Sequence, residues 1–384
     1  MTTTTWRFDF VLPNLVLPDR EPGIDSAPQI GEWPDGITLG SEFIAIVPHR
    51  DSRLMDIRGA SPEAAKLFDS FRTPGGHVHS PAAVIVRNDA PELVRTDMEC
   101  LVAFRNAVAF AFILRARAAL GKGAPSAEPA WSDTFDLHPT IVSPTNRLVT
   151  RSEALLAVFS AEAEHLATHS PHISPCGRRL YPDAYLFRAL SEIWERRYLA
   201  GDRSVFTTAV FRALEVAFLA SSVANKNQGS LSEYGTQLAL WISAIEVLAW
   251  PTKGRADLPA VLALLEGFDW ASDKLGEKRY QARYRQKAIA ATAVQYAYSL
   301  MYGARNEFLH GNPVSAETLV PKEFSTTLSL PRIASTVFRT ALAAYLRPAV
   351  PFQEFADFEL SHEIINDFAY SRALKFAFGL ERDT

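Results

Sequence analysis

The spacing of apolar residues changes character about one third of the way along the chain. Residues 6–10 alternate apolar and polar, and short apolar runs at 37–47 and 82–86 are bounded by Pro, Gly or Asp. Alternation with a period of two residues predicts β-strands. A longer apolar segment from 97 to about 119 has no such alternation and predicts a helix. The N-terminal third therefore indicates a mixed α+β region.

Beyond about residue 150 the apolar pattern is helical almost throughout. Short connections between consecutive helical patterns are typical of an antiparallel helical bundle. The segment 121–139, rich in Gly, Pro, Ser and Asp, is the best candidate for a linker. We therefore expect a mainly α protein, with a smaller mixed α+β domain at 1–145 and a helical domain at 150–384. The expected helices of the second domain are 152–167, 184–199, 204–224, 237–250, 278–309, 331–346 and part of 352–378.

Composition and charge narrow the classes of function. The 384 residues carry a formal net charge of -4, so any nucleic-acid site must be a local basic patch. Cys100 and Cys176 cannot form a disulfide framework, and the N-terminus has no apolar signal region, which predicts a cytoplasmic protein. The apolar segment 101–120 is interrupted by three arginines, which argues against a membrane span. No phosphate-binding loop, dinucleotide fingerprint or hydrolase nucleophile elbow occurs in the sequence.

The most distinctive candidate chemistry lies in residues 302–312, Tyr-Gly-Ala-Arg-Asn-Glu-Phe-Leu-His-Gly-Asn. Arg305 falls at the edge of the expected core stripe, where its guanidinium needs acceptors. Tyr302, Asn306 and His310 are four residues apart and share a neighbouring strip of the helix. Arg305 and His310 are five apart and point in different directions on an ideal helix. Either His310 bends inward at the helix end, or a second copy of the chain completes the site.

A second candidate lies in the helical segment 234–252, which is apolar on nearly every face. Glu246 is its only charged residue. A lone carboxylate in such a helix should be paired, hydrogen-bonded or protonated. Arg305 is one candidate partner, and another hydroxyl or arginine is the alternative.

At these residues the chain resembles the HEPN superfamily and, within it, the Apea-like branch. That family carries an Arg-x(4 to 6)-His motif, often with Asn after the Arg and Gly after the His, preceded by a helix with an Ala-x-Glu signature. Here Arg305, Asn306, His310 and Gly311 match the first part, and Ala244-Ile245-Glu246 matches the second. The resemblance covers about residues 203–349 and implies a HEPN-like helical core there. It also implies a homodimer, and the interrupted apolar segment 101–120 argues against a membrane partner.

Many members of that family look like metal-independent endoribonucleases, which implies RNA as the substrate and no cofactor. Under this hypothesis His310 acts as general base or acid, because the pKa of histidine lies near neutrality. Arg305 stabilises charge on the phosphorus, Asn306 orients His310 or the phosphate, and Tyr302 supports them. The resemblance implies a 2′,3′-cyclic phosphate product and, by analogy, a toxin or an antiviral defence effector.

Other family members are non-catalytic, which leaves a second hypothesis open. The same bundle could serve as an RNA-binding or dimerisation scaffold, while residues 1–145 sense a protein or ligand partner. In that case Arg305, Asn306 and Glu246 form a polar network that fixes the helix register, and His310 is a helix cap.

A basic, tyrosine-containing stretch at 274–287 precedes the motif. Cations can hold phosphates while aromatic rings stack on unpaired bases, so this stretch predicts an RNA grip. The alternative is an ordinary solvated helix face. The candidate RNA-binding residues are Lys278, Arg279, Tyr280, Arg283, Tyr284, Arg285 and Lys287.

Metal binding is the least favoured chemistry. A cluster of acidic, histidine and cysteine residues between 162 and 176 has no His-Glu-x-x-His spacing, and Pro171 interrupts its helix. His77 and His79 lie in a Gly-rich stretch and are most simply loop residues. We therefore expect no metal site. The residues of the cluster are Glu162, Glu164, His165, His169, His172 and Cys176.

Overall fold

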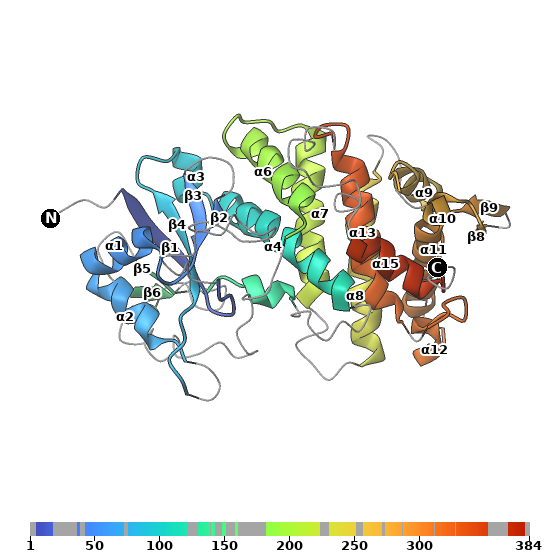
Figure 1. Cartoon of the computed structure of the whole chain (residues 1–384), viewed down its shortest axis with the longest axis horizontal. Coiled ribbons are helices and arrows are strands. Elements are labelled where there is room, and N and C mark those ends of the chain that lie inside the picture. The colour runs from blue at the N-terminus through green and yellow to red at the C-terminus, as the bar shows by residue number, and fades with distance from the viewer. Residues whose placement is uncertain are drawn as a thin grey trace. The chain divides into compact units, whose positions relative to one another are not determined.

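The computed structural model of the chain is mainly helical, with a small antiparallel sheet near the N-terminus (Figure 1). It divides into two compact units, each made of separate stretches of sequence. Helices α4 (Met98–Leu120) and α6 (Ala184–Tyr198) contribute residues to both units. The units therefore divide the chain differently from the boundary expected at 145–150. The structure describes residues 5–17, 37–38, 43–72, 76–120, 130–138, 140–142, 148–150, 158–159, 182–222, 230–250, 256–270, 273–285, 287–310, 312–326, 328–351 and 368–380.

Unit 1, which comprises residues 1–105, 130–180 and 194–201, is organised on a four-stranded antiparallel sheet. The strands follow the order β1-β4-β3-β2, and the two central strands are almost completely buried. Apolar side chains of the sheet pack against helices α1 and α2 in one core. The strands predicted from the alternating residues are confirmed here. The bounds are β1 Trp6–Leu12, β2 Ile37–Thr38, β3 Ile44–Val47, β4 Ala82–Arg87, α1 Ser52–Ala60, α2 Pro62–Ser70 and α3 Glu92–Thr96.

Local capping explains two helices that the apolar pattern did not predict. Asp51 accepts the backbone N–H of Arg53 at the start of α1. Ser61 accepts the N–H of Ala64 at the start of α2, where Pro62 occupies the first turn. Such caps satisfy backbone donors that a helix start leaves without partners. Each helix has nine residues, which is too short for a clear apolar period.

A short three-stranded antiparallel sheet follows in sequence, after the 3-10 helix Ser132–Phe135. Its strands are β5 (Thr140–Val142), β6 (Leu148–Thr150) and β7 (Val158–Phe159). The helix expected at 152–167 is therefore wrong at Val158 and Phe159, which pair with β6. A β-branched and an aromatic residue favour the strand there. The rest of that expected helix lies outside the described residues.

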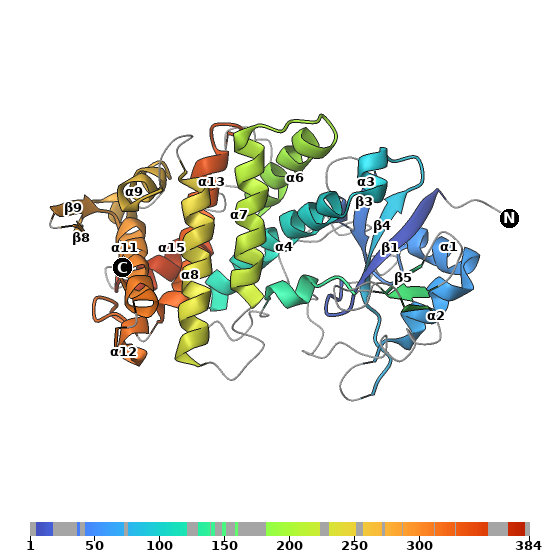
Figure 2. The same ribbon diagram turned by 180° about the vertical axis from the view of Figure 1, so that it is seen from behind.

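Unit 2, which comprises residues 106–129, 181–193 and 202–384, is built from packed helices. Helix α8 packs against α7, α11 and α13, and α11 also packs against α9 and α13. Helices α7 and α8 lie side by side in both views (Figures 1 and 2). The helices predicted at 184–199, 204–224, 237–250 and 331–346 are confirmed. The bounds are α7 Val205–Ser222, α8 Leu231–Leu248, α9 Leu258–Glu266, α10 Asp273–Gly276, α11 Ala293–Leu309, α12 Ala316–Leu319, α13 Leu330–Leu346 and α15 Phe368–Ala377.

The continuous helix predicted at 278–309 is wrong in its first part. Residues 280–291 form a β-hairpin of β8 (Tyr280–Tyr284) and β9 (Lys287–Ala291). Thr292 then caps α11 by accepting the N–H of Gln295, whose side chain accepts the N–H of Thr292 in return. This reciprocal cap starts the helix at Ala293. The alternation of half-buried Tyr280, buried Ala282 and half-buried Tyr284 with exposed residues marks a strand.

Helix α7 is, within the described part of the chain, the one helix long and apolar enough to cross a membrane. Half of its residues are buried inside the protein, where it packs against α8. Burial of this kind is also what the core helix of a helical domain requires. The cytoplasmic location stays a prediction.

Candidate functional site

Helix α11 carries the Arg-Asn-x-x-x-His motif near its C-terminal end. Its buried face follows the helical period, as the sequence predicts. The helix ends at Leu309, and His310 is the capping residue, donating its backbone N–H to the Asn306 carbonyl at 3.0 Å. Gly311, the expected terminating glycine, lies outside the described residues. The buried residues of the stripe include Val294, Ala297, Tyr298, Met301 and Ala304.

Arg305 is half-buried and is held by its neighbours on the same helix. Its Nη1 donates to Oδ1 of Asn306 at 3.3 Å. Its guanidinium lies over the ring of Tyr302, with 5.8 Å from Cζ to the ring centroid. Its buried Nε has no hydrogen-bond acceptor among the described residues. Two neighbouring side chains thus fix the position of Arg305, and its Nε donor makes no hydrogen bond to the described residues.

Helices α8 and α11 run antiparallel. Gly235 near the start of α8 meets Phe308 in the last turn of α11, and Glu246, further along α8, lies near Tyr298, further back along α11. Glu246 lies about three turns beyond Gly235, which brings it level with the Tyr298 region of α11. No ion pair joins Glu246 to Arg305 in the described part of the chain. The candidate pairing is therefore not found as a direct contact, since Arg305 lies about two turns further along α11.

The Glu246 carboxyl nevertheless interacts electrostatically with Arg305 of the motif. Burial raises the pKa of Glu246, and the positive charge of Arg305 opposes that shift. Tyr298 is fully buried, and in the part of the chain that the structure describes its hydroxyl has no hydrogen-bond partner. Burial raises the pKa of Tyr298 well above its usual value, and the Glu246 charge raises it further. Glu246, Tyr298 and Arg305 therefore form one electrostatically coupled group between α8 and α11.

His310 reaches solvent at the end of α11, where its residue is exposed. Five helical residues separate it from Arg305, a rotation of about 140° and a rise of roughly 7.5 Å. His310 does not bend back onto Arg305 in any contact that the structure records. A phosphate that meets both groups must therefore bridge the helix end, or a second copy must supply one of them.

The candidate RNA-binding cations lie on and before the β8–β9 hairpin. Two of them are already paired, Lys278 with Glu266 at 2.5 Å and Arg279 with Glu277. Arg283, Arg285 and Lys287 are exposed, and none of the three makes an ion pair within the described residues. The hairpin thus presents a tip of three available positive charges.

The two hairpin tyrosines are engaged inside the protein. Tyr280 stacks on Tyr296, with ring centroids 5.1 Å apart and an interplanar angle of 10°. The Tyr284 hydroxyl donates to Asp257 at 3.2 Å. These rings therefore anchor the hairpin to α11 and α9 instead of offering free faces for base stacking.

The hairpin and the motif lie at opposite ends of α11. Lys287 precedes the first turn of the helix, and His310 follows the last one. A helix of 17 residues spans roughly 25 Å. An RNA that contacts both regions must follow the length of α11.

The histidine and cysteine candidates for metal binding receive no support where they are described. No group of three or more His, Cys, Asp or Glu is placed to hold a metal ion within the described residues. The cluster at 162–176 lies outside them. His79 is buried with its Nε2 against the Pro13 carbonyl, and burial lowers its pKa. His79 is therefore a packed structural residue, and His77 is exposed.

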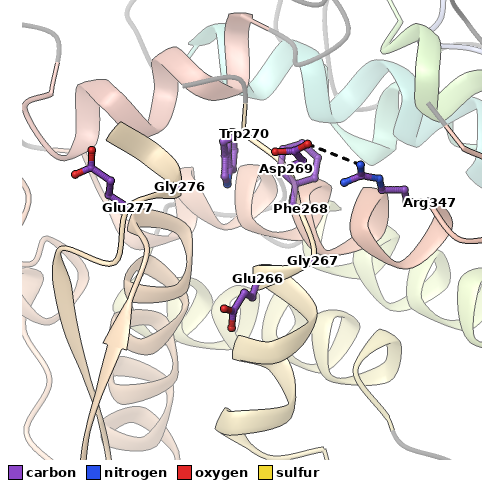
Figure 3. Close-up of a pocket in the computed structure, with 8 residues that line it drawn as sticks. All are labelled: Glu266, Gly267, Phe268, Asp269, Trp270, Gly276, Glu277 and Arg347. Atoms are coloured by element: carbon purple, nitrogen blue, oxygen red, sulfur yellow. Dashed lines mark ion pairs between the residues drawn. The ribbon is translucent and has the colours of Figure 1, made fainter. Parts of the chain in front are cut away.

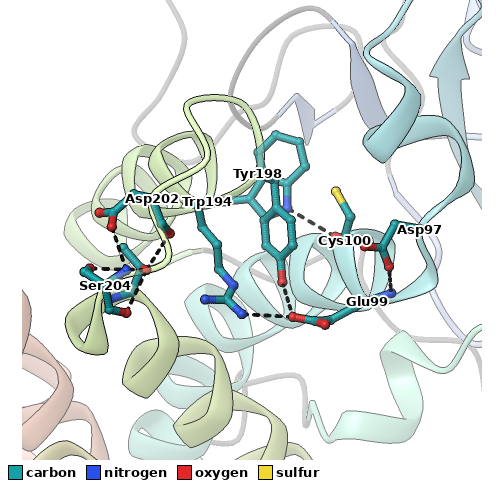
Figure 4. A network of polar contacts seen from close by, with 9 residues as sticks. Asp97, Glu99, Cys100, Trp194, Tyr198, Asp202 and Ser204 are labelled. Atoms are coloured by element: carbon teal, nitrogen blue, oxygen red, sulfur yellow. Dashed lines mark hydrogen bonds and ion pairs between the residues drawn. The ribbon is translucent and has the colours of Figure 1, made fainter.

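Cys100 is also a structural residue. It is buried, and its carbonyl accepts the indole N–H of Trp194 at 3.2 Å (Figure 4). Beside it, the Glu99 carboxylate accepts from Arg197 at 3.0 Å and from the Tyr198 hydroxyl at 3.2 Å. This network ties α6 to the first turn of α4.

The sequence hypotheses missed a pocket of about 540 Å³ in unit 2 (Figure 3). It is lined by residues 266–270, residues 276–277 and Arg347. The sequence feature that could have indicated this pocket is the segment Gly267-Phe268-Asp269-Trp270. It places one acidic and two aromatic side chains in the connection between α9 and α10.

Comparisons with family models, with curated proteins and with solved structures gave no match for this chain. The resemblance to the HEPN superfamily therefore depends on the motif residues and their positions.

Proposed function

We propose that the chain is a metal-independent endoribonuclease of HEPN type, with the motif of α11 as its active site. The observation that supports this most directly is the exposed His310, which follows immediately after the helical turn in which Asn306 and Tyr302 hold Arg305. A solvent-reachable imidazole and an immobilised guanidinium at one helix end supply the groups that RNA transesterification needs.

The proposed reaction begins when His310 removes the proton of a ribose 2′-hydroxyl. The 2′-oxygen then attacks the adjacent phosphorus, and the P–O bond to the 5′-oxygen of the next nucleotide breaks. That oxygen takes a proton from a general acid, leaving a 2′,3′-cyclic phosphate and a 5′-hydroxyl. Arg305 stabilises the negative charge that accumulates on the phosphoryl oxygens.

A homodimer would supply the second group that this proton balance requires. Because His310 and Arg305 diverge on one helix, two copies of α11 facing each other would bring two imidazoles to one phosphate. One would act as the base and the other as the acid, and a two-fold axis would make the arrangement symmetric. Such an enzyme would suit a toxin or an antiviral defence effector.

The three available cations of the hairpin, Arg283, Arg285 and Lys287, would hold the RNA backbone. They extend along the hairpin before α11, so they would contact phosphates several nucleotides from the cleavage point. Tyr280 and Tyr284 would position the hairpin, since both are packed within the protein.

A non-catalytic scaffold for RNA binding or dimerisation is the second candidate. The observation that favours it is that the motif side chains contact one another. Arg305 contacts Asn306 and Tyr302, and its positive charge interacts with the Glu246 carboxyl. Such a network can fix helix register without any catalysis. The N-terminal region would then sense a protein or ligand partner.

Cleavage of RNA in the presence of a chelator separates these two functions. Wild type, His310→Ala and Arg305→Ala are incubated with structured and unstructured RNA in EDTA. The exposed His77 provides a matched control, His77→Ala. We expect wild type and His77→Ala to cut, and His310→Ala to lose about 100-fold or more in rate.

The other outcomes of that experiment are equally informative. RNA binding by all four proteins without cleavage would replace the nuclease proposal with the scaffold. Loss of cutting in EDTA would show that a metal ion is required and would also overturn the proposal. Circular dichroism of the Arg305→Ala variant checks that its loss of activity is not a loss of fold.

A further inference from the structure

The pocket between α9, α10 and the end of α13 is polar and carries a hydrogen-bond donor without an acceptor. Trp270 is only 8% exposed, and its indole Nε1 has no hydrogen-bond partner among the residues that the structure describes. Figure 3 shows this nitrogen at the lower end of the ring, on the side of the pocket where Glu266 lies. A buried donor without an acceptor carries a free-energy cost, because it has lost its hydrogen bond to water and gained none in return. A ligand with an oxygen acceptor would remove that cost.

The charged side chains of the pocket favour a cation beside that acceptor. Its lining contains three carboxylates, Glu266, Asp269 and Glu277, and one guanidinium, Arg347. Two of the carboxylates already have close cationic partners outside the lining, Glu266 with Lys278 and Glu277 with Arg279. The Asp269 carboxylate is 80% exposed and lies 3.8 Å from Arg347, the longest of the three pairs. Asp269 is therefore the acceptor most open to an additional cation.

The aromatic residues of the pocket do not offer a stacking surface. Phe268 is 4% exposed, and its ring already lies 5.3 Å from the guanidinium of Arg339. Phe268 and Trp270 pack edge to face with centroids 4.6 Å apart. A nucleobase or an apolar ligand would thus find little free ring area. A polyanion would meet three carboxylates.

We propose that this pocket binds an α-ammonium group with its neighbouring carbonyl or carboxyl oxygen, as found in a free amino acid or at the N-terminus of a peptide. The oxygen accepts from Nε1 of Trp270, and the ammonium lies against the Asp269 carboxylate. Arg347 is placed to support the carboxylate of a free amino acid. The volume of about 540 Å³ accommodates either source. This site is independent of the proposed nuclease.

Isothermal titration calorimetry with three probes tests the proposal. The probes are L-alanine, L-alanyl-L-alanine and N-acetyl-L-alanine, titrated into the full chain. We expect one or both of the first two to bind and the acetylated probe, which has no ammonium group, not to bind. Preference for alanine indicates a free amino acid, and preference for the dipeptide indicates a peptide N-terminus. Absence of binding by all three up to about 10 mM would overturn the proposal.

Two variants locate the binding, and a third is the control. Trp270→Phe keeps the ring and removes the N–H, so we expect about tenfold weaker binding. Asp269→Asn changes a side chain that is 80% exposed, and we expect a similar loss. Trp250→Phe alters an indole that is 56% exposed outside the pocket and should bind as wild type does. Unchanged affinity in both pocket variants would contradict the assignment.

Discussion

Gly235 of α8 lies directly against the ring of Phe308 in α11, so closely that a β-carbon on Gly235 would be 2.3 Å from Cδ1 of Phe308. Heavy atoms that are not bonded do not approach to that distance. The glycine is therefore what allows the start of α8 to meet the last turn of α11, the turn just before His310. The close approach of these two helices depends on the absence of one methyl group.

Gly235→Ala should therefore destabilise the fold by about 1–3 kcal/mol, because Phe308 or the helices must move. A loss of stability is informative here, because alanine ordinarily stabilises a helix by about 1 kcal/mol relative to glycine. Gly303→Ala is the matched control in α11, where a new β-carbon would meet nothing within 4 Å. That variant should be more stable than wild type. Urea unfolding of both proteins measures the two effects, and an equal sign for both would contradict the close approach.

The second prediction concerns the buried ion pair between Asp183 and Arg339. Nε of Arg339 donates to the Asp183 carboxylate at 2.9 Å, and their side chains are 3% and 0% exposed. Asp183 also accepts the N–H of Leu186 in the first turn of α6. Removal of one partner leaves a charge buried without compensation, which costs about 3–5 kcal/mol.

Asp183→Ala should accordingly lower the unfolding free energy by several kcal/mol in a denaturant titration. Asp89→Ala provides the control, because its pair with Arg87 at 2.5 Å is exposed, with 63% of the Asp89 side chain accessible. Exposed pairs contribute about 1 kcal/mol or less. Similar losses in the two variants would show that Asp183 is not buried as described.

Long helices were the elements that the sequence predicted best. The segments that became α6 and α13 keep an apolar period over at least 15 residues, which indicates a helix with one buried face. The segments that became α7 and α8 are apolar on most faces, and their length favours a helix over a strand. The β8–β9 hairpin could not be found in this way. Its residues are rich in Arg, Lys, Ala and Gln, which favour helices, and pairing between its strands decides the outcome.

The candidate site was partly predictable for the same reason. Helical spacing alone places Tyr302 and Asn306 within reach of Arg305, and the structure records both contacts. The position of Glu246 relative to Arg305 depends on the contact between Gly235 and Phe308, which no local pattern encodes. The Trp270 pocket also depends on long-range packing, because it joins the α9–α10 connection to Arg347 at the end of α13.

A third prediction follows from Asp9 in β1, whose side chain is 12% exposed. Burial raises the pKa of Asp9 from 3.8 to about 6, although Arg7 opposes the shift. The folded state therefore holds the proton of Asp9 more tightly than the unfolded state does. This contribution to stability is complete below pH 3.8 and is lost as the pH rises through about 6.

Asp9→Asn should remove that pH dependence and increase stability near pH 7, by at most about 3 kcal/mol. Unfolding free energies of wild type and variant, measured between pH 4 and pH 8, should diverge as the pH increases. Asp89→Asn is the comparison, because the hydrogen bond from Arg87 lowers the pKa of Asp89. Its contribution is lost only as the pH falls below 3.8, so the difference between wild type and Asp89→Asn should stay nearly constant between pH 4 and pH 8. A constant difference between wild type and Asp9→Asn across this range would contradict the raised pKa.

A fourth prediction concerns the turn that joins β8 and β9. Pairing of Tyr284 with Lys287 leaves a two-residue loop, and Arg285 in that loop has a φ of 47°. This left-handed conformation is unfavourable for a side chain with a β-carbon and suits glycine. Arg285→Gly should therefore leave stability unchanged or raise it by up to about 1 kcal/mol. Ala290→Gly, near the middle of β9 and exposed, should lower stability. Thermal unfolding of the two variants and wild type measures both effects.

The last prediction concerns the salt dependence of RNA binding, and it depends on the proposed contact between the hairpin and RNA. Binding to single-stranded RNA releases counterions, so the slope of log K against log salt changes by about 0.7 for each phosphate contact. The triple variant Arg283→Gln, Arg285→Gln, Lys287→Gln removes three cations that have no ion-pair partner among the described residues. We expect the slope to become shallower by about 2.

The double variant Lys278→Gln, Arg279→Gln is the control. It should change the slope less, because Glu266 and Glu277 already neutralise those side chains. Equal slopes in the wild type and the triple variant, measured by fluorescence anisotropy between 50 and 300 mM salt, would remove the hairpin from the RNA-binding surface without bearing on the chemistry of His310.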